Sequence, residues 1–213
     1  VVRNILSGAR TEDRRPVKPQ PEPGHTLHTH WNDSWKPRPR LRASWEYWSG
    51  PVFDGRPEGH LGGLCRAVAP WSPGDVLYVR ETWRSVGWRP ENGHWIEYAD
   101  GVKRWADAPA DTLSIDVANP AHPERWRPSI HMPKWAARIH LRVLSVGVER
   151  VGDITEAGAR AEGCAGRPGI HPIAEFRELW NRIYPASKDA KPWAWCDKET
   201  PWVWVTKFER VTP

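Results

Sequence analysis

The run ARIHLRVLSVGVERV, residues 137–151, carries the strongest strand signal in this sequence. It is rich in valine, isoleucine and leucine, which suit the pleated, half-buried surface of a sheet. Two other runs alternate their side chains with a period of two: GDVLYVRETW, residues 74–83, and PWVWVTKFERV, residues 201–211. We expect all three runs to be strands.

Shorter elements are expected between these strands. HWIEYADGVKRW, residues 94–105, holds two strand-like runs around Asp100-Gly101, a dipeptide typical of a two-residue type I′ hairpin turn. VVRNILS at the start places its apolar residues on one helical face, and Gly8 suits the left-handed position that follows a helix.

Two further helices are expected in the last third of the chain. Asp153 and Glu156 match a capping box that opens a short helix ending at Gly163. HPIAEFRELWNRIY, residues 171–184, repeats its apolar residues at helical spacing. Strands in separated pieces, helices between them and no regular βαβ alternation favour an α+β fold. We expect a small β-barrel flanked by short helices rather than a parallel sheet.

Two stretches break this pattern. Between about residues 16 and 73, proline, glycine and tryptophan occur without clear periodicity. The prolines there exclude a regular helix or a central strand. Residues 107–128 have a similar character. We interpret both as irregular Trp/Pro-rich insertions in a single domain that spans residues 1–213.

The composition narrows the class of partner. The chain has 16 tryptophans but only 3 phenylalanines and 4 tyrosines, so some indoles can remain for stacking on a flat ligand. Its formal charge is +5 and its pI is near 9.3. A mildly basic balance suits a partner that carries phosphate, and it equally suits an ordinary basic protein.

The cysteines and the apolar runs indicate the compartment. Cys65, Cys164 and Cys196 are far apart and form no CxxC pair, so neither a zinc ribbon nor a disulfide framework is expected. No apolar run approaches the length of a membrane span. These features favour reduced thiols and a cytoplasmic protein with no membrane partner. Because the chain opens on Val1 and its sole methionine is Met132, we expect further sequence before it.

The stretch LSGARTEDRRPVKP, residues 6–19, concentrates charge in the loop that we expect to follow the first helix. Its pattern is G-x-R-x-x-D-x-R, formed by Gly8, Arg10, Asp13 and Arg15, with Arg14 and Lys18 beside them. Guanidinium groups next to loop N–H groups suit a phosphate or a carboxylate. The alternative is a solvated turn in which Asp13 pairs with the arginines.

Other sites receive weaker support from the residues. His25, His28 and His30 sit in a Pro-rich segment without a rigid frame, so we expect no metal. The phosphate-binding P-loop, the G-x-S-x-G elbow and HExxH are absent, and no cofactor is indicated. Trp193 and Trp195 suit either base stacking or a core.

Taken in order, five stretches resemble the ASCH domain family of the PUA-like superfamily, in the longer form found in phages and prophages. They are ILSGARTEDRRPVKP, PGDVLYVRETW, WRPSIHMPKWAARIHLRVLSVGVERVGDITEAGARAEG, FRELWNRIY and PWVWVTKFERV. Together they cover nearly the whole chain apart from the two insertions. The resemblance implies a β-barrel flanked by helices, with a cleft that accepts RNA, DNA or a modified nucleoside.

The resemblance also assigns candidate residues. The family motif reads G-x-K-x-x-E-x-R: Gly8 and Arg15 match it, Arg10 replaces the lysine and Asp13 replaces the glutamate. In small ASCH amidohydrolases that remove an acyl group from the N4 of cytidine, a lysine and a threonine of this motif act with a glutamate. Aligned through ITEAGARAEG, that glutamate falls on Glu162. Arginine does not lose its proton as lysine can, which favours binding over hydrolysis.

We therefore expect a cleft that recognises nucleic acid or a modified nucleobase. The residues expected to line it are Gly8, Arg10, Asp13, Arg15 and Glu162. Arg14 and Lys18 are expected to meet phosphate. The tryptophans expected to stack on the base are Trp83, Trp193 and Trp195.

Two alternatives stay open. The first is a hydrolase, either an amidohydrolase acting on N4-acylated cytidine or a ribonuclease, in which Asp13 and Glu162 activate a water beside Arg10. The second is a phage structural or interaction protein in which the cleft is vestigial. No feature of the sequence indicates an oligomeric state.

Overall fold

The structure is a computed structural model that describes residues 2–18, 20, 26–32, 40–48, 52–53, 56–57, 61–89, 93–107, 125–185, 195 and 200–212. The chain groups into two compact units. The first contains Arg3–Asp75 and Arg142–Glu209, and the second contains Val76–Leu141 and Arg210–Pro213. The expectation of a single domain over residues 1–213 stays a prediction.

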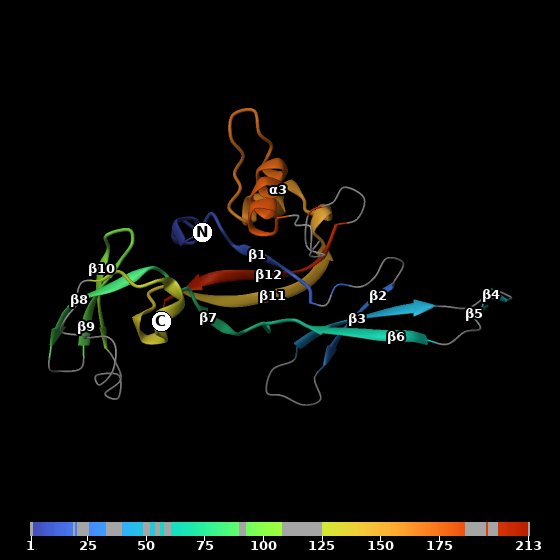
Figure 1. Cartoon of the computed structure of the whole chain (residues 1–213), viewed down its shortest axis with the longest axis horizontal. Helices are drawn as coiled ribbons and strands as arrows, with labels where there is room; N and C mark the ends of the chain where they lie inside the picture. Colours follow the sequence, from blue (N-terminus) through green and yellow to red (C-terminus); the bar gives the residue numbers. More distant parts are fainter. Residues whose placement is uncertain are drawn as a thin grey trace. The chain divides into compact units, whose positions relative to one another are not determined.

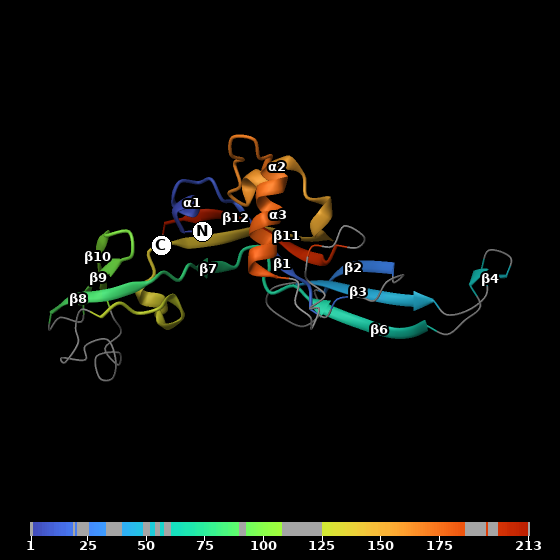
Figure 2. The same ribbon diagram turned by 45° about the horizontal axis from the view of Figure 1, so that its top comes forward.

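The main sheet is built from the three strand runs named above and a short strand from the opening motif. Its order is β1-β12-β11-β7, with β1 at Glu12–Pro16, β12 at Trp202–Val211, β11 at His140–Arg150 and β7 at Val76–Tyr78. β1 and β12 are antiparallel, and the long strands of the first unit curl (Figures 1 and 2). The mixed α/β class with mostly antiparallel strands is thereby confirmed. The expected strand over 74–83 is shorter than predicted, because β7 ends at Tyr78.

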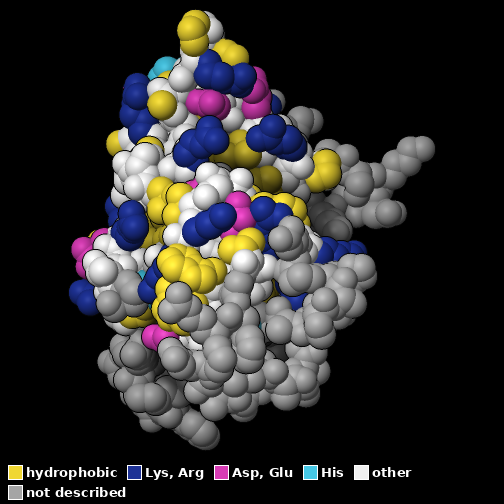
Figure 3. Space-filling view, turned by 90° about the vertical axis from the view of Figure 1, so that its left-hand side faces the viewer, with side chains coloured by type: hydrophobic (Ala, Val, Ile, Leu, Met, Phe, Trp, Pro, Cys, Tyr) yellow, Lys and Arg dark blue, Asp and Glu magenta, His cyan; other side chains and the backbone are white. Residues whose placement is uncertain are grey.

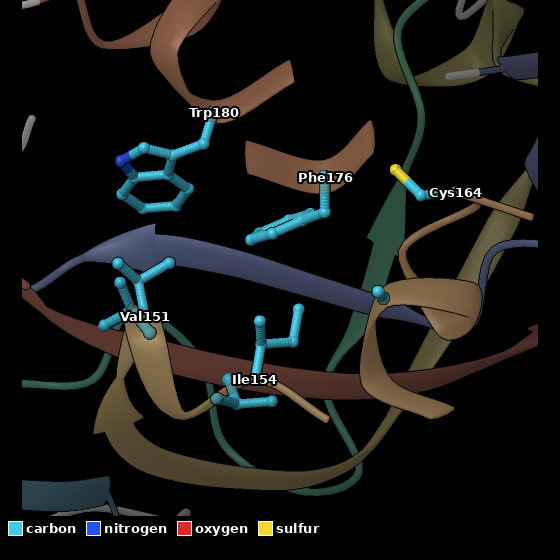
Figure 4. Close-up of a cluster of buried hydrophobic side chains, with 8 residues drawn as sticks. Val151, Ile154, Cys164, Phe176 and Trp180 are labelled. Atoms are coloured by element: carbon cyan, nitrogen blue, oxygen red, sulfur yellow. The ribbon is translucent and has the colours of Figure 1, made fainter. Parts of the chain in front are cut away.

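Helix α3 supplies the apolar cover of the first unit. The helices are α1 (Val2–Leu6), α2 (Glu156–Ala161) and α3 (Pro172–Ile183). Phe176 and Trp180 of α3 are buried in a cluster with Val151, Ile154 and Cys164 (Figure 4), to which β12 adds apolar side chains. The expected α3 is confirmed, and burying this cluster is the main apolar contribution to holding it in place.

Helix α2 begins two residues later than the capping pattern predicts. The side chain of Thr155, and not that of Asp153, accepts the Gly158 N–H at 3.1 Å. Residues Val151–Asp153 instead form a 3-10 turn that precedes the cap. At the other end Gly163 has a φ of 89°, the left-handed conformation expected after the helix.

The expectation of irregular structure between about 16 and 73 is wrong. This stretch forms a three-stranded antiparallel sheet of order β2-β3-β6, with β2 at Thr26–Asn32, β3 at Arg40–Trp48 and β6 at Leu61–Val68. A short pair adds β4 (Val52–Phe53) and β5 (Arg56–Pro57). The central strand β3 contains no proline. Pro37, Pro39 and Pro51 flank it without removing any of its own hydrogen-bond donors.

The second unit is a small antiparallel sheet with an apolar core. Its order is β10-β9-β8, with β8 at Trp83–Arg89, β9 at Gly93–Tyr98 and β10 at Lys103–Asp107. Short 3-10 turns at Ser129–His131 and Lys134–Ala136 follow. The core residues are Trp83, Ile96, Tyr98, Ala106, Met132, Ala136 and Ala137.

The β9–β10 hairpin is confirmed, but its turn differs from the predicted one. The N–H of Gly101 donates to the Tyr98 carbonyl at 2.8 Å, and Gly101 has a φ of 83°. The turn therefore runs over 98–101 instead of centring on Asp100-Gly101. Of the second expected insertion, 107–128, residues 108–124 lie outside the described residues, and Arg127 pairs with the backbone of Trp83.

In the part of the chain that the structure describes, no helix has the length and apolar character required to span a membrane.

Candidate functional site

The segment between α1 and β1 is held against the end of α2 by backbone hydrogen bonds. The Arg10 N–H donates to the Asn4 carbonyl at 3.0 Å, and the Thr11 N–H donates to the Ala161 carbonyl at 2.8 Å. Arg10 and Glu162 consequently lie opposite each other as an isolated antiparallel bridge. Two residues that are distant in the sequence are thus fixed as neighbours by the backbone itself.

Half of the charged motif lies on a strand. The expectation that it occupies a loop is wrong for Asp13, Arg14 and Arg15, which belong to β1. Successive side chains of a strand point to opposite faces. Glu12 and Arg14 are buried, whereas Asp13 is half-buried and Arg15 is exposed. The strand therefore divides the motif into a buried half and an accessible half.

In the accessible half, Arg10 joins two carboxylates. Its Nη2 donates to Asp13 Oδ1 at 2.5 Å and lies 2.9 Å from Glu162 Oε2. The other Asp13 oxygen accepts from Arg15 Nε at 2.7 Å. The side chain of Arg15 is 59% exposed and that of Asp13 is 27% exposed. The structure thus brings together four of the expected site residues, Arg10, Asp13, Arg15 and Glu162.

Arg14 belongs to the buried half. Its side chain is 4% exposed, and its Nε donates to Glu149 Oε1 at 2.8 Å. Its Nη1 lies 2.9 Å from Glu12 Oε2 and 3.3 Å from Glu162 Oε1. Burial lowers the pKa of Arg14, but the hydrogen bond and charge of Glu149, with the other two carboxylates, raise it above its ordinary value. The burial of Arg14 contradicts its expected role at a phosphate, because its N–H donors point into the protein.

Glu162 is the most perturbed carboxyl of the site. It is 3% exposed, and burial raises its pKa to about 7, with the charge of Asp13 acting in the same direction. Arg10 and Arg14 oppose this shift. Near neutral pH, Glu162 can therefore take up or release a proton, which suits either a ligand-sensitive contact or acid–base chemistry.

Besides Glu12, three residues of this cluster carry no signal in the sequence. Glu149, on β11, contacts Arg14 from a distant part of the chain. Lys207, on β12, lies 3.2 Å from Glu12, because β1 and β12 pair Glu12 with Lys207. Tyr184 follows α3, and burial together with the charge of Asp13 raises its pKa. Only the register of the strands and the docking of α3 place these residues, so no local pattern signals them.

The remaining motif residues lie at the edges of the cluster. Gly8 is exposed and has a φ of 74°, and a side chain there would meet no neighbouring atom within 4 Å. Its role is therefore to end α1 in the left-handed conformation. Lys18 is exposed just after β1.

Two of the three expected stacking tryptophans are described, and both pack in apolar clusters. Trp83 is 1% exposed in the core of the second unit. Trp195 is half-buried against the α3 core, with its ring 6.2 Å from that of Phe176. Trp193 lies outside the described residues. The buried Trp83 therefore offers no stacking surface, and Trp195 packs on the α3 core.

Within the described residues, no group of three or more His, Cys, Asp or Glu side chains is placed to hold a metal ion. His25 lies outside the described residues, and the side chains of His28 and His30 are likewise not described.

Comparisons of the chain with protein-family models, with curated proteins and with solved structures find no match.

Proposed function

We propose that the first unit is an ASCH-type, PUA-like domain that binds nucleic acid or a modified nucleobase at Arg10, Asp13 and Arg15. The observation that supports this proposal is the guanidinium of Arg10, held between Asp13 and the buried Glu162. Donors and acceptors are thereby pre-arranged at a place that solvent reaches through Asp13 and Arg15.

A nucleobase edge carries the complementary groups. Cytosine presents an amino donor beside ring and carbonyl acceptors, and guanine presents carbonyl and ring-nitrogen acceptors. The Asp13 carboxylate can accept from an amino group, while arginine donates to acceptors in a fixed fork. Arg15, the most exposed charge of the cluster, suits a phosphate. Arg14 supports the site from behind by holding Glu149 and Glu162.

Charge reversal at matched positions tests the proposal. Arg15 and Arg142 have similarly exposed side chains, 59% and 53%, and each pairs with one carboxylate. We expect Arg15→Glu to weaken binding of labelled single-stranded U12 RNA or dT12 DNA by roughly tenfold, about 1.4 kcal/mol, and Arg142→Glu to change it little. Fluorescence anisotropy measures both. Equal losses in the two variants, or no binding by the parent protein, would instead favour a structural or interaction protein.

A hydrolase is the second candidate, and the pKa of Glu162 near 7 favours it. A carboxyl that titrates near neutral pH can act as general acid or base. Incubation with N4-acetylcytidine and with labelled RNA, followed by chromatography of the products, separates the two candidates. The binding proposal expects no turnover. Turnover that Glu162→Gln abolishes would replace that proposal with the hydrolase.

A further inference from the structure

The second unit exposes two tryptophans on the surface of its sheet. Trp95, on β9, is 42% exposed, and Trp126 is 41% exposed. Trp126 precedes Arg127, whose backbone pairs with Trp83 at the start of β8 through hydrogen bonds of 2.8 and 3.2 Å. This pairing fixes the 125–127 segment beside the sheet. Exposed aromatic side chains grouped on one surface indicate a place for a partner.

Strand register and ring contacts place both tryptophans on the same face. Trp105 lies directly opposite Trp95, with the ring centroids 5.7 Å apart. Arg84 lies opposite Glu97, which is two residues after Trp95 and so shares its face. The Arg84 guanidinium in turn lies 4.7 Å from the ring centroid of Trp126. We call this surface the Trp95 face, formed by Arg84, Trp95, Glu97, Lys103, Trp105 and Trp126.

The charges of the Trp95 face and of Arg125 beside it leave a small positive excess, because Arg84, Lys103 and Arg125 stand against two carboxylates, Glu97 and Asp107. Glu97 lies 2.8 Å from Arg84, which neutralises it. Asp107, two residues after Trp105 and therefore on the same face, accepts a hydrogen bond from the Trp105 Nε1–H at 3.1 Å. Arg125 and Lys103 are exposed. On the face of the molecule that Figure 3 presents, Lys and Arg side chains lie beside hydrophobic ones. Aromatic surface combined with excess positive charge complements bases joined by phosphates.

We propose that the Trp95 face binds single-stranded nucleic acid, with bases stacked on Trp95 and Trp126 and phosphates beside Lys103 and Arg125. Stacking on an indole accepts any base, because every base has a π-face. The guanidinium of Arg84 lies over one face of the Trp126 ring, so a base is expected to stack on the opposite face. The binding is therefore tolerant of sequence, and it does not depend on the Arg10 cluster of the first unit.

An abasic probe separates stacking from charge. Fluorescence anisotropy with dT12, U12 and an abasic 12-mer of the same charge compares the full chain carrying Arg15→Glu, in which binding at the first unit is weakened, with two double variants made in that chain. We expect Trp95→Ala/Trp126→Ala to weaken binding of dT12 and U12 by at least about tenfold and to leave the abasic probe unaffected. Trp95→Phe/Trp126→Phe keeps aromatic rings and is expected to recover most of the affinity.

Control variants show whether a loss of binding comes from misfolding or from the first unit. Ile130 is 68% exposed, and Ile130→Ala is expected to bind like the parent chain. Circular dichroism and thermal melting check that the variants fold. Equal affinity of the alanine variant and the parent chain, or an equal loss on the abasic probe, would overturn the inference. Complete loss of binding in Arg15→Glu alone would overturn it too, while leaving the proposal for the first unit standing.

Discussion

Arg10 and Glu162 meet through both backbone and side chain: their residues form an antiparallel bridge, and Nη2 lies 2.9 Å from Oε2. One residue precedes the first strand of the curled sheet, and the other caps the C-terminal end of α2. The contact therefore joins the first and last thirds of the chain. It also places a proton-accepting carboxyl directly behind the accessible charges of the candidate site.

Neighbouring arginines of β1 are expected to differ sharply in their effect on stability. The side chain of Arg14 is 4% exposed and forms ion pairs with three carboxylates. The side chain of Arg15 is 59% exposed and pairs with one carboxylate. Arg14→Met should lower the free energy of unfolding by about 3 kcal/mol at pH 7.5, because it leaves buried carboxylates without their partner. Arg15→Met should cost less than about 1 kcal/mol. Urea denaturation measures both, and equal costs would contradict the division of β1 into two faces.

The titration of Glu162 predicts a pH-dependent stability. Its pKa rises from 4.5 to about 7 in the folded state, so between these values the folded protein binds more protons than the unfolded chain. The contribution of Glu162 to stability is therefore full below about pH 4.5 and is lost as the pH rises toward 7. Relative to the parent chain, Glu162→Gln should gain about 3 kcal/mol between pH 4.5 and pH 8. Denaturation curves measure the free energy of unfolding of both proteins. A difference between them that stays constant from pH 4.5 to pH 8 would contradict the raised pKa.

The same titration predicts the pH dependence of binding at the first unit. Protonated Glu162 no longer offsets Arg10 and Arg14, so the cluster gains one positive charge as the pH falls through about 7. Affinity for U12 is therefore expected to be higher at pH 6 than at pH 8. In Glu162→Gln the ratio of the two affinities should approach one. Anisotropy titrations at constant ionic strength test this expectation. If the ratio of the affinities at pH 6 and pH 8 is the same in Glu162→Gln as in the parent chain, the pH dependence comes from other groups.

The N-cap of α2 gives a test of register. Thr155 accepts the Gly158 N–H at 3.1 Å, so Thr155→Ala should lower stability by about 1 kcal/mol. Asp153 is exposed in the preceding 3-10 turn, and Asp153→Ala should change stability by less than about 0.5 kcal/mol. Thermal melting compares the stability of the two variants. A larger loss of stability in Asp153→Ala than in Thr155→Ala would support the capping box predicted from Asp153.

Replacement of Arg138 by lysine is expected to destabilise the protein. Its Nε and Nη2 donate to the two oxygens of Glu81 at 2.9 and 2.7 Å, and its guanidinium lies 4.1 Å from the ring centroid of Tyr98. Lysine cannot reproduce the paired hydrogen bonds or the flat stacking. Arg138→Lys should therefore lower the free energy of unfolding by about 1–2 kcal/mol. The exposed Arg142→Lys serves as the control, and equal effects in urea denaturation would contradict a structural role for the fork.

Local patterns predicted the elements whose signal lies within one short segment. The β-branched run of β11, the helical spacing of α3 and the left-handed Gly8 and Gly163 are all visible in the sequence. Each depends on period or on backbone freedom over a few residues. The strands β2, β3 and β6 escape prediction because prolines are frequent in this part of the sequence, although those prolines only flank the central strand.

The sequence by itself determined the α+β class, the long strands and the charged motif that begins at Gly8. The tertiary structure decided what that motif is. Pairing of β1 with β12 turned Arg14 inward and Arg15 outward, and docking of α2 brought Glu162 to Arg10. Burial of Arg14 and the raised pKa of Glu162 depend on neighbours that are distant along the chain. Desolvation and long-range ion pairs belong to the packed protein, so no local pattern of residues could supply them.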